Sequence, residues 1–345
     1  MFFKRISYLF KQKQSVFKDI KLCSSSVVIN NIEELEQKLL KVAIVGVPNV
    51  GKSTVINHLM DRKVCPTSSK VHTTRKRATA IFTEGDTQVV FLDTPGLVNI
   101  KEYNKYKLER SFVKDPNASL QNADIVGVIH DVSNQYTKDR LDLKVIKLLE
   151  KHVKKPSFLV LNKIDMLKSK RKLLDITRLL TENKIRGEEI PDKGDFEMNE
   201  DSRGWPNFQD IFMVSALTGD GLEDVRNYLL EQAKPGKWLY DAEVWSDQPP
   251  ETIILNTVKA KFMDFLNEEL PYVLVPEMEL FEVDVNGVIK TIVNVRCPSV
   301  RKAQLIAGAN DGRLKNITAA VQKDLQQTFQ NFVRISIYLH ALPNK

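Results

Sequence analysis

Residues 41–54 read KVAIVGVPNVGKST, an apolar run followed by a glycine-rich turn and a segment that favours a helix. The turn from Gly46 to Ser53 matches the pattern GxxxxGK[ST]. Placed after a strand and before a helix, this pattern points successive backbone N–H groups at a β-phosphate. Lys52 would then reach the β- and γ-phosphate oxygens, and the Ser53 hydroxyl would reach Mg²⁺. The stretch therefore predicts a phosphate-binding loop (the P-loop) at the end of a buried strand.

Short, nearly continuous apolar runs recur after this loop. Together with the first they predict strands over 41–46, 88–96, 124–133, 157–165 and 210–216. Such runs are typical of parallel strands that are buried on both faces. Helices are expected between them, over 52–61, 101–112, 138–152 and 167–183. The alternation predicts an α/β fold with a doubly wound, mostly parallel sheet.

Polar residues stand where these strands are expected to end, which is where ligands bind in such sheets. Asp93 begins Asp93-Thr94-Pro95-Gly96 at the end of an apolar run. An aspartate there can hold Mg²⁺ through water, and the Gly96 N–H can meet a γ-phosphate. We therefore expect a magnesium-bound nucleoside triphosphate at this edge of the sheet.

The base of that nucleotide is predicted from two further motifs. Asn162-Lys163-Ile164-Asp165 ends another apolar run. A carboxylate at Asp165 can accept two hydrogen bonds from guanine N1–H and N2–H₂, a donor pair that adenine lacks. After the next strand, the Ala216 N–H can face guanine O6. The residues expected to bind GTP are Gly46, Pro48, Asn49, Val50, Gly51, Lys52, Ser53, Thr54, Asp93, Asn162, Lys163, Asp165, Ser215, Ala216 and Leu217.

Length and composition indicate a soluble globular protein. The 345 residues are 42% apolar and 28% charged, which fits about two domains. No apolar stretch of 18 or more residues free of charge occurs, so a conventional transmembrane helix is not expected. Three scattered cysteines, Cys23, Cys65 and Cys297, argue against a disulfide framework or a structural zinc site.

The N-terminus differs from the rest of the chain. Residues 1–18 carry five Lys or Arg residues and no acid, interleaved with apolar side chains. This pattern is typical of a mitochondrial transit peptide, with a basic tail on a cytosolic protein as the alternative. We assign residues 1–38 to this leader and expect residence in the mitochondrial matrix, with peripheral contact to the inner membrane left open.

The remaining chain divides by composition. Residues 39–234 form the expected nucleotide domain, interrupted at 186–210 by an acidic insertion loop with eight acids against three bases. A segment containing Pro and Gly, residues 235–250, is expected to be a linker. Residues 251–345 form a smaller α+β unit, with a helix over 253–269, strands over 278–285, 290–297 and 333–339, and a helix pair around a glycine loop over 299–328.

These motifs resemble the TrmE/Era group of GTPases. The resemblance rests on Pro48-Asn49 within the P-loop and on Thr73-Thr74-Arg75 before the run AIF. SDQPPE (246–251), EELPY (268–272) and the glycine loop of the last unit are similar to Era-like proteins in particular. The resemblance covers about 40–345, apart from the acidic insertion. It implies a GTPase domain followed by a KH domain that binds small-subunit ribosomal RNA during ribosome assembly, and with the leader the chain resembles a mitochondrial member.

The resemblance also implies roles for single residues. Lys52, Thr74 and Gly96 would serve hydrolysis, while Ser53, Thr74 and Asp93 would hold Mg²⁺. Asn49 stands where the related group helps to bind K⁺, although such a residue can equally hydrogen-bond its own turn. Leu97 occupies the position of the water-orienting glutamine of Ras-like enzymes, which predicts slow intrinsic hydrolysis.

The last unit is expected to carry the RNA-binding surface. Residues 285–345 hold nine bases against two acids, which favours contact with phosphate. A KH loop has the form GXXG; here Gly308 is followed by Asp311 and then by Gly312, so the second glycine is either replaced or displaced by one residue. The expected RNA contacts are Arg296, Arg301, Lys302, Gly308, Ala309, Asn310, Gly312, Arg313 and Lys315.

The leading hypothesis is a monomeric GTPase switch that acts on the small ribosomal subunit. GTP would order residues 67–77 and the segment after Gly96, and hydrolysis would release them. A second hypothesis is an RNA-binding chaperone whose nucleotide is structural and hardly hydrolysed. A third is a GTPase tethered to a membrane by its basic leader.

Overall fold

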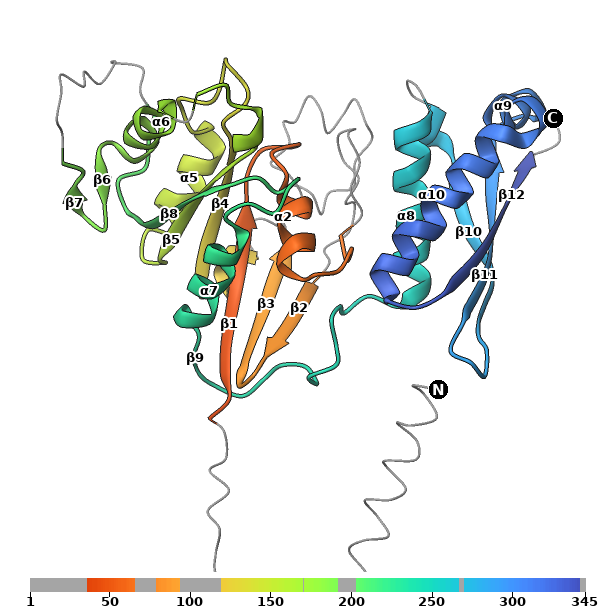
Figure 1. The fold of residues 1–345 in the computed structure, drawn as a ribbon, viewed down its shortest axis with the longest axis horizontal. Helices are drawn as coiled ribbons and strands as arrows, with labels where there is room; N and C mark the ends of the chain where they lie inside the picture. Colours follow the sequence, from red (N-terminus) through yellow and green to blue (C-terminus); the bar gives the residue numbers. More distant parts are fainter. Residues whose placement is uncertain are drawn as a thin grey trace, which may run out of the picture. The chain divides into compact units, whose positions relative to one another are not determined.

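The structure is a computed structural model that describes residues 36–65, 79–93, 119–169, 171–191, 203–266 and 270–341. It divides into two compact units, one spanning Gln37–Asn256 and one running from Thr257 to the end of the described chain. Figure 1 shows an α/β unit containing strands β1 to β9 and a smaller unit containing β10 to β12. The predicted helix over 101–112 lies outside the described residues.

The first unit is built on one mixed sheet. Its described strands lie in the order β2-β3-β1-β4-β5-β8, with β9 (Lys234–Pro235) paired to β1. Strands β3, β1, β4, β5 and β8 are mutually parallel, whereas β2 is antiparallel to β3. Their bounds are β1 Lys38–Val45, β2 Thr79–Glu84, β3 Thr87–Asp93, β4 Ile125–Asp131, β5 Ser157–Asn162 and β8 Phe208–Val214. The predicted doubly wound, mostly parallel sheet is confirmed.

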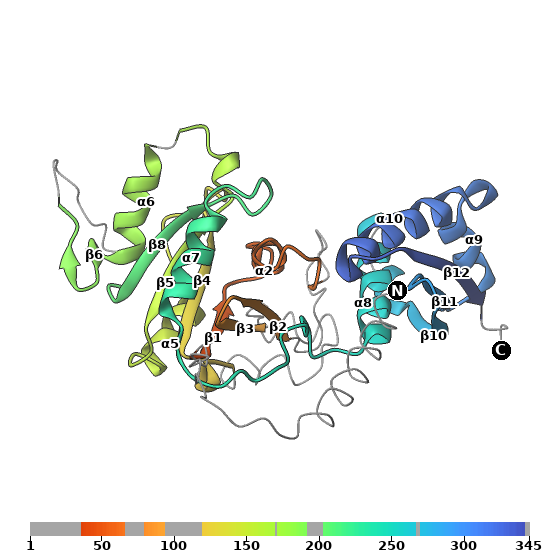
Figure 2. The same cartoon turned by 60° about the horizontal axis from the view of Figure 1, so that its bottom comes forward.

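Helices cover both faces of this sheet, as the two views of Figures 1 and 2 show. Helices α2 (Lys52–Leu59) and α7 (Leu222–Gln232) pack on one face, in a cluster that includes Val55, Ile56 and Leu229. Helices α5 (Leu143–Lys151) and α6 (Lys172–Thr181) pack on the other. Because β3, β1, β4, β5 and β8 are parallel, their carboxyl ends lie at the same edge of the sheet.

Several expected boundaries shift. Helix α5 begins at Leu143 rather than 138, because the Asp142 side chain accepts the Lys144 N–H and caps the first turn. Strand β8 is only partly buried, although its apolar run suggests burial on both faces; it lies at the sheet edge, where Met213 is 39% exposed.

The range predicted as an acidic loop, 186–210, is only partly a surface segment. Strands β6 (Lys184–Ile185) and β7 (Glu188–Glu189) form a short hairpin at its start. At its end, Trp205 and Phe208 are buried in the core on the α5 and α6 side. The acidic composition of the range gives no indication of these two buried aromatic side chains. Because they are buried, residues from 203 onward belong to the folded unit.

The predicted linker is fastened along the sheet. Gln88 of β3, which is fully buried, donates to the Tyr240 carbonyl and accepts the N–H groups of Leu239 and Tyr240. Further on, Ser246 bridges to Ala80, and Asp247 accepts the N–H of Thr79. Residues 236–247 (the strap) therefore cover the otherwise exposed edge strand β2.

The second unit is a three-stranded sheet with helices. Strand β10 (Val275–Val283) is antiparallel to β11 (Ile289–Cys297), which is parallel to β12 (Val333–Ala341). Helices α8 (Pro250–Phe265), α9 (Val300–Ala307) and α10 (Gly312–Phe329) complete the order α-β-β-α-α-β, with short 3₁₀ turns η2 (Leu270–Val273) and η3 (Ala309–Asp311). Alternate β11 residues are buried, as are Phe262, Val321 and Leu325 of the helices. This is the expected α+β unit of KH type.

Candidate functional site

The P-loop joins β1 to α2 and packs tightly against neighbouring strand ends. Gly51 has φ 98°, and a Cβ there would lie 2.3 Å from Asn162 Nδ2. A Cβ at Gly46 would lie 2.6 Å from the carbonyl oxygen of Ile129 in β4. Only glycine fits both positions, which explains the two glycines of the motif.

The interior of the loop holds the motif lysine. Lys52 is 8% exposed, and its ammonium donates to the carbonyls of Gly46 (3.1 Å) and Val47 (3.0 Å). Gly51 caps α2 without a side-chain acceptor, so no side chain caps the helix N-terminus where a phosphate would sit. Ser53 follows in the first turn, and Asp93 ends the neighbouring β3 opposite Ile44. The loop and its lysine therefore fit a phosphate group, with a hydroxyl on α2 suited to a magnesium ion.

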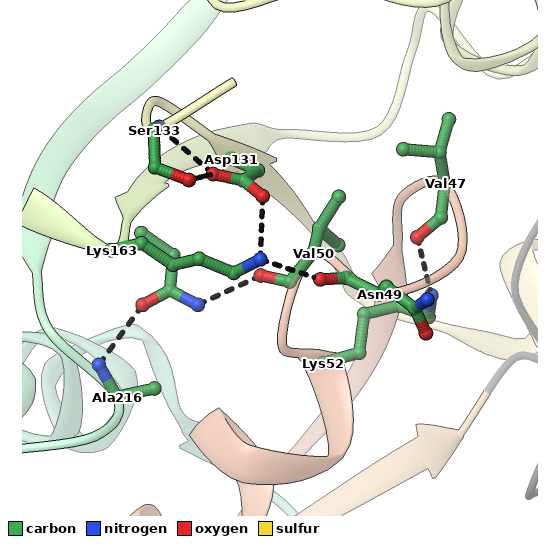
Figure 3. A network of polar contacts seen from close by, with 9 residues as sticks. Val47, Asn49, Val50, Lys52, Asp131, Ser133, Lys163 and Ala216 are labelled. Atoms are coloured by element: carbon green, nitrogen blue, oxygen red, sulfur yellow. Dashed lines mark hydrogen bonds and ion pairs between the residues drawn. The ribbon is translucent and has the colours of Figure 1, made fainter. Parts of the chain in front are cut away.

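Asn162 ties together three of the loops at the sheet edge. Its side chain is 1% exposed; Nδ2 donates to the Val50 carbonyl (2.7 Å), and Oδ1 accepts the Ala216 N–H (2.9 Å). The ends of β5 and β8 are thereby joined to the P-loop (Figure 3). In the structure the buried Ala216 N–H is paired with Asn162 Oδ1, and its contact with guanine O6 stays a prediction.

Lys163 makes the second link. It has a left-handed backbone (φ 68°), and its ammonium donates to the Asn49 carbonyl (2.9 Å) and to Asp131 Oδ2 (2.5 Å), as Figure 3 shows. Asp131 Oδ1 in turn accepts the N–H and the hydroxyl of Ser133. Burial alone would raise the pKa of Asp131, but the hydrogen bonds from Lys163 and Ser133 outweigh it and the pKa is lowered.

Asp131 is a site residue that the sequence reasoning missed. The sequence does contain an indication of it, since Asp131 follows the apolar residues of β4 as Asp93 and Asn162 follow those of β3 and β5. Asp131 belongs to no short nucleotide-binding motif, so the sequence alone does not distinguish it as a site residue.

The residues predicted to recognise the base lie on the neighbouring turns. Asp165 is exposed on the short 3₁₀ helix η1 (Ile164–Met166). Ser215 is buried, and its hydroxyl accepts the Thr218 N–H (3.2 Å), which closes the turn after β8. Leu217 is 78% exposed at the tip of that turn. Thr74, Gly96 and Leu97 lie outside the described residues.

The turn between α9 and α10 shows which residue takes the place of the second glycine of the GXXG pattern. Gly308 has φ 74°, and a Cβ there would lie 3.0 Å from the Cβ of Arg313, so this glycine is required. Asp311 adopts a left-handed backbone (φ 58°). Gly312 is the first helical residue of α10, and a Cβ there would meet nothing within 4 Å. The turn therefore runs over residues 308–311, with Asp311 in place of a second glycine.

Basic side chains lie on both helices that this turn connects. Arg301, Lys302, Arg313 and Lys315 are exposed on the two helices that flank it, and Ala309 and Asn310 are exposed within it. Arg296 differs, because it lies on β11 and pairs with Glu277 across the sheet. Leu305, beside the turn, is 60% exposed. The arrangement combines positive charge, backbone N–H groups and an apolar side chain, which are the groups that bind single-stranded RNA.

Known sequences match this chain over most of its length. A family model described as "50S ribosome-binding GTPase" matches residues 41–163. "GTPase Era, mitochondrial" of Danio rerio is 37% identical over 333 residues, which cover 87% of this chain and 74% of that protein. "GTPase Era" of Afipia carboxidovorans is 30% identical over 305 residues, which cover 88% and 89%.

A solved structure has the same fold. The crystal structure of Era in complex with MgGDPNP and nucleotides 1506–1542 of 16S ribosomal RNA matches with a TM-score of 0.70 and 24% identity, covering 89% of this chain and 95% of that one. Given relatives at 37% and 30% identity over most of both chains, this chain belongs to the Era family of GTPases, enzymes that hydrolyse GTP.

Proposed function

We propose that this GTPase binds small-subunit ribosomal RNA in mitochondria and acts as an assembly factor for the small ribosomal subunit. The observation that carries the proposal is the turn at residues 308–311, flanked by exposed basic side chains, in the same chain as the P-loop. The solved Era complex with a 16S RNA fragment supports this partner. The family model described as "50S ribosome-binding GTPase" matches only residues 41–163, so its name does not refer to the second unit, which carries the proposed RNA contacts.

The nucleotide is GTP before hydrolysis and GDP after it. The P-loop holds the phosphates, Lys52 neutralises charge on their oxygens, and Asp165 reads the guanine edge. Ser53, Thr74 and Asp93 would hold Mg²⁺, which supplies further neutralisation of phosphate charge. The magnesium nucleotide in the solved Era complex supports this assignment.

Hydrolysis is slow without a partner. Leu97 lacks a donor or acceptor with which to orient water, so Lys52, Thr74 and Gly96 would serve hydrolysis without a water-orienting side chain. Asn49, in the P-loop, would help to hold K⁺ beside them. Turnover measured in potassium and in sodium buffers tests this role, because equal rates in both would exclude it.

The mitochondrial location is supported by two observations. The basic, acid-free stretch over residues 1–18 is typical of an import signal, and relatives from Danio rerio and Salmo salar are named as mitochondrial. In the part of the chain that the structure describes, no helix is both long and apolar enough to cross a membrane.

A structural nucleotide that is hardly turned over is the second candidate, and Leu97 favours it. Single-turnover hydrolysis with and without RNA separates the two. Acceleration by RNA supports the switch, whereas a negligible rate in both conditions supports the structural role.

The test of the RNA partner is crosslinking in cells followed by sequencing of the bound RNA. We expect one small-subunit rRNA site for the intact protein and a large loss of that site for Arg301→Gln. Lys147→Gln removes an exposed lysine from α5 of the other unit and is the matched control. Recovery of large-subunit RNA, or an equal loss for the control, would contradict the proposal.

A further inference from the structure

Asp131 lies at the centre of the polar network but belongs to none of the motifs that define the GTP site. It ends β4, between β1, which leads into the P-loop, and β5, which leads into Lys163. Its two carboxylate oxygens have separate partners. Oδ1 accepts the N–H (2.9 Å) and the hydroxyl (2.6 Å) of Ser133, and Oδ2 accepts the ammonium of Lys163 (2.5 Å) (Figure 3).

We propose that Asp131 is a positioning residue for nucleotide binding, which holds the Lys163 ammonium against the Asn49 carbonyl and thereby fixes the P-loop. The inference concerns the GTP site of this family and does not depend on the RNA partner proposed above. Asp131 itself need not touch the nucleotide, because it acts through Lys163.

The geometry gives Asp131 this role for two reasons. The Lys163 ammonium has one neutral acceptor, the Asn49 carbonyl, and one charged acceptor, Asp131. The side chains of Lys163 and Asp131 are only 30% and 17% exposed, so their attraction is screened less than that of a surface pair. The two bonds from Ser133 fix the carboxylate and leave Oδ2 directed at Lys163. Removal of the carboxylate charge would therefore release the ammonium from its stronger partner.

The consequence reaches the phosphate site through two adjacent links. Lys163 bonds the carbonyl of Asn49, and Asn162 bonds that of Val50. These P-loop residues directly precede Gly51 and Lys52, whose backbone N–H groups face the phosphates in this motif. Without the Lys163 bond, the P-loop also adopts conformations that do not bind nucleotide. The apparent affinity then falls in proportion to the fraction of molecules that keep the binding conformation. GDP and GTP should be affected alike, because both need the same loop.

The first experiment measures binding of a fluorescent GDP and a fluorescent non-hydrolysable GTP analogue to the full-length protein. For Asp131→Asn we expect affinity for both to fall about tenfold, which equals about 1.4 kcal/mol, mainly through faster dissociation. The preference for guanine over adenine should stay unchanged, because Asp165 remains. Asp124→Asn is the matched control; it removes a carboxylate at the opposite end of the β4 region, where Asp124 bonds Lys41, and should leave affinity unchanged.

A double-mutant cycle with Lys163→Met shows whether Asp131 acts through the lysine. In the Lys163→Met protein, adding Asp131→Asn should change affinity less than twofold. A full tenfold effect in that background would overturn the proposal, as would an unchanged affinity of Asp131→Asn alone.

Asp131→Glu provides a rescue test. It keeps the charge and extends the side chain by one methylene, so GDP affinity should return most of the way toward that of the unsubstituted protein. Affinity as low as that of Asp131→Asn would show that charge on this carboxyl is not the cause. Unfolding midpoints of all variants are measured in parallel, and a drop in affinity that tracks the loss of stability rather than the charge would also overturn the role.

Discussion

Asp165 is the side chain that we propose recognises the base. It stands exposed on η1, at the edge of the sheet where Asn162 and Ala216 bond each other. Its carboxylate can accept the two N–H donors of guanine.

Asp165→Asn tests this assignment. The amide presents its own N–H donors toward those of guanine, so two hydrogen bonds to a charged acceptor are lost. We expect the preference for GDP over ADP to fall at least about 100-fold. Competition of both nucleotides against labelled GDP measures it. Asp175→Asn, which changes an exposed carboxylate on α6, is the control, and a preference that survives in Asp165→Asn would contradict the assignment.

His130, next to Asp131, makes stability depend on pH. It is buried, and burial lowers its pKa below the usual 6.5, since the charged imidazolium would lose its hydration. Its Nε2 lies 3.0 Å from the Lys138 carbonyl, an acceptor only, so this nitrogen carries the hydrogen of the neutral ring.

The sign of the pH effect follows from this lowered pKa. Below pH 6.5 the unfolded chain takes up a proton at His130 and the native protein does not. The free energy of unfolding therefore falls as the pH drops from 6.5 toward the native pKa, by at most about 1.4 kcal/mol per pH unit. His130→Gln keeps a donor for Lys138 and removes the titration. Urea unfolding at pH 8 and pH 5.5 should show a smaller difference for this variant, and an equal difference would exclude His130 as the cause.

At the residue level, the motif residues could be predicted because each was a polar residue at the end of an apolar run. What could not be predicted was which groups bond each other once the strands are side by side. The Ala216 N–H, expected at the guanine, is paired with Asn162, and Asp131 joins Lys163 across two strands. These contacts depend on the register of β4, β5 and β8, which no single segment of sequence contains.

Among the elements, α8 and α10 of the second unit are joined by an ion pair in the core. Lys261 and Asp324 lie 2.9 Å apart, with side chains 14% and 10% exposed. Losing one partner leaves the other charge nearly buried; among the described residues, Asp264 lies farther from the Lys261 ammonium, at 3.8 Å.

We expect Asp324→Leu to destabilise the second unit by about 3 kcal/mol. The double variant Lys261→Met, Asp324→Leu should regain most of this loss, because it removes both charges and keeps the volume. Chemical unfolding of the full chain, followed by hydrogen exchange in α8 and α10, measures both. An equal loss in the single and the double variants would show that packing, not charge, is responsible.

Element order was largely predictable, and element ends were not. The parallel strands and the order of the second unit follow from hydrophobic period and turn residues. The start of α5 depends on the Asp142 cap, and the buried Trp205 and Phe208 depend on a core formed by distant helices. The sequence favours a linker over 235–250 because its prolines, Pro235, Pro249 and Pro250, are typical of free chain, whereas the strap within it is held through backbone groups and Gln88.

For the molecule as a whole, the arrangement of charge predicts how RNA binding responds to salt. Arg301 and Lys302 are exposed in the first turn of α9, the helix that precedes the turn at 308–311. If each contacts one phosphate of a single strand, each contributes about 0.7 to the slope of log affinity against log salt concentration.

The double variant Arg301→Gln, Lys302→Gln should therefore lower that slope by about 1.4 and weaken binding. Fluorescence anisotropy with a 3′ fragment of small-subunit rRNA over a potassium chloride series measures it. The GTPase-unit variant Lys147→Gln should keep the original slope. A slope that is unchanged in the double variant would place the phosphate contacts elsewhere.

The strap has a mechanical consequence. A pulling force applied to the chain at Pro250 would be borne by the contacts of the strap with β2 and β3, which are the Thr79–Asp247 hydrogen bond, the bridge between Ala80 and Ser246, and the hydrogen bonds of Gln88. Only Gln248 and Pro249 lie between Asp247, the last of these anchors, and the start of α8. A force on the chain at that point would therefore act on Thr79, the first residue of β2.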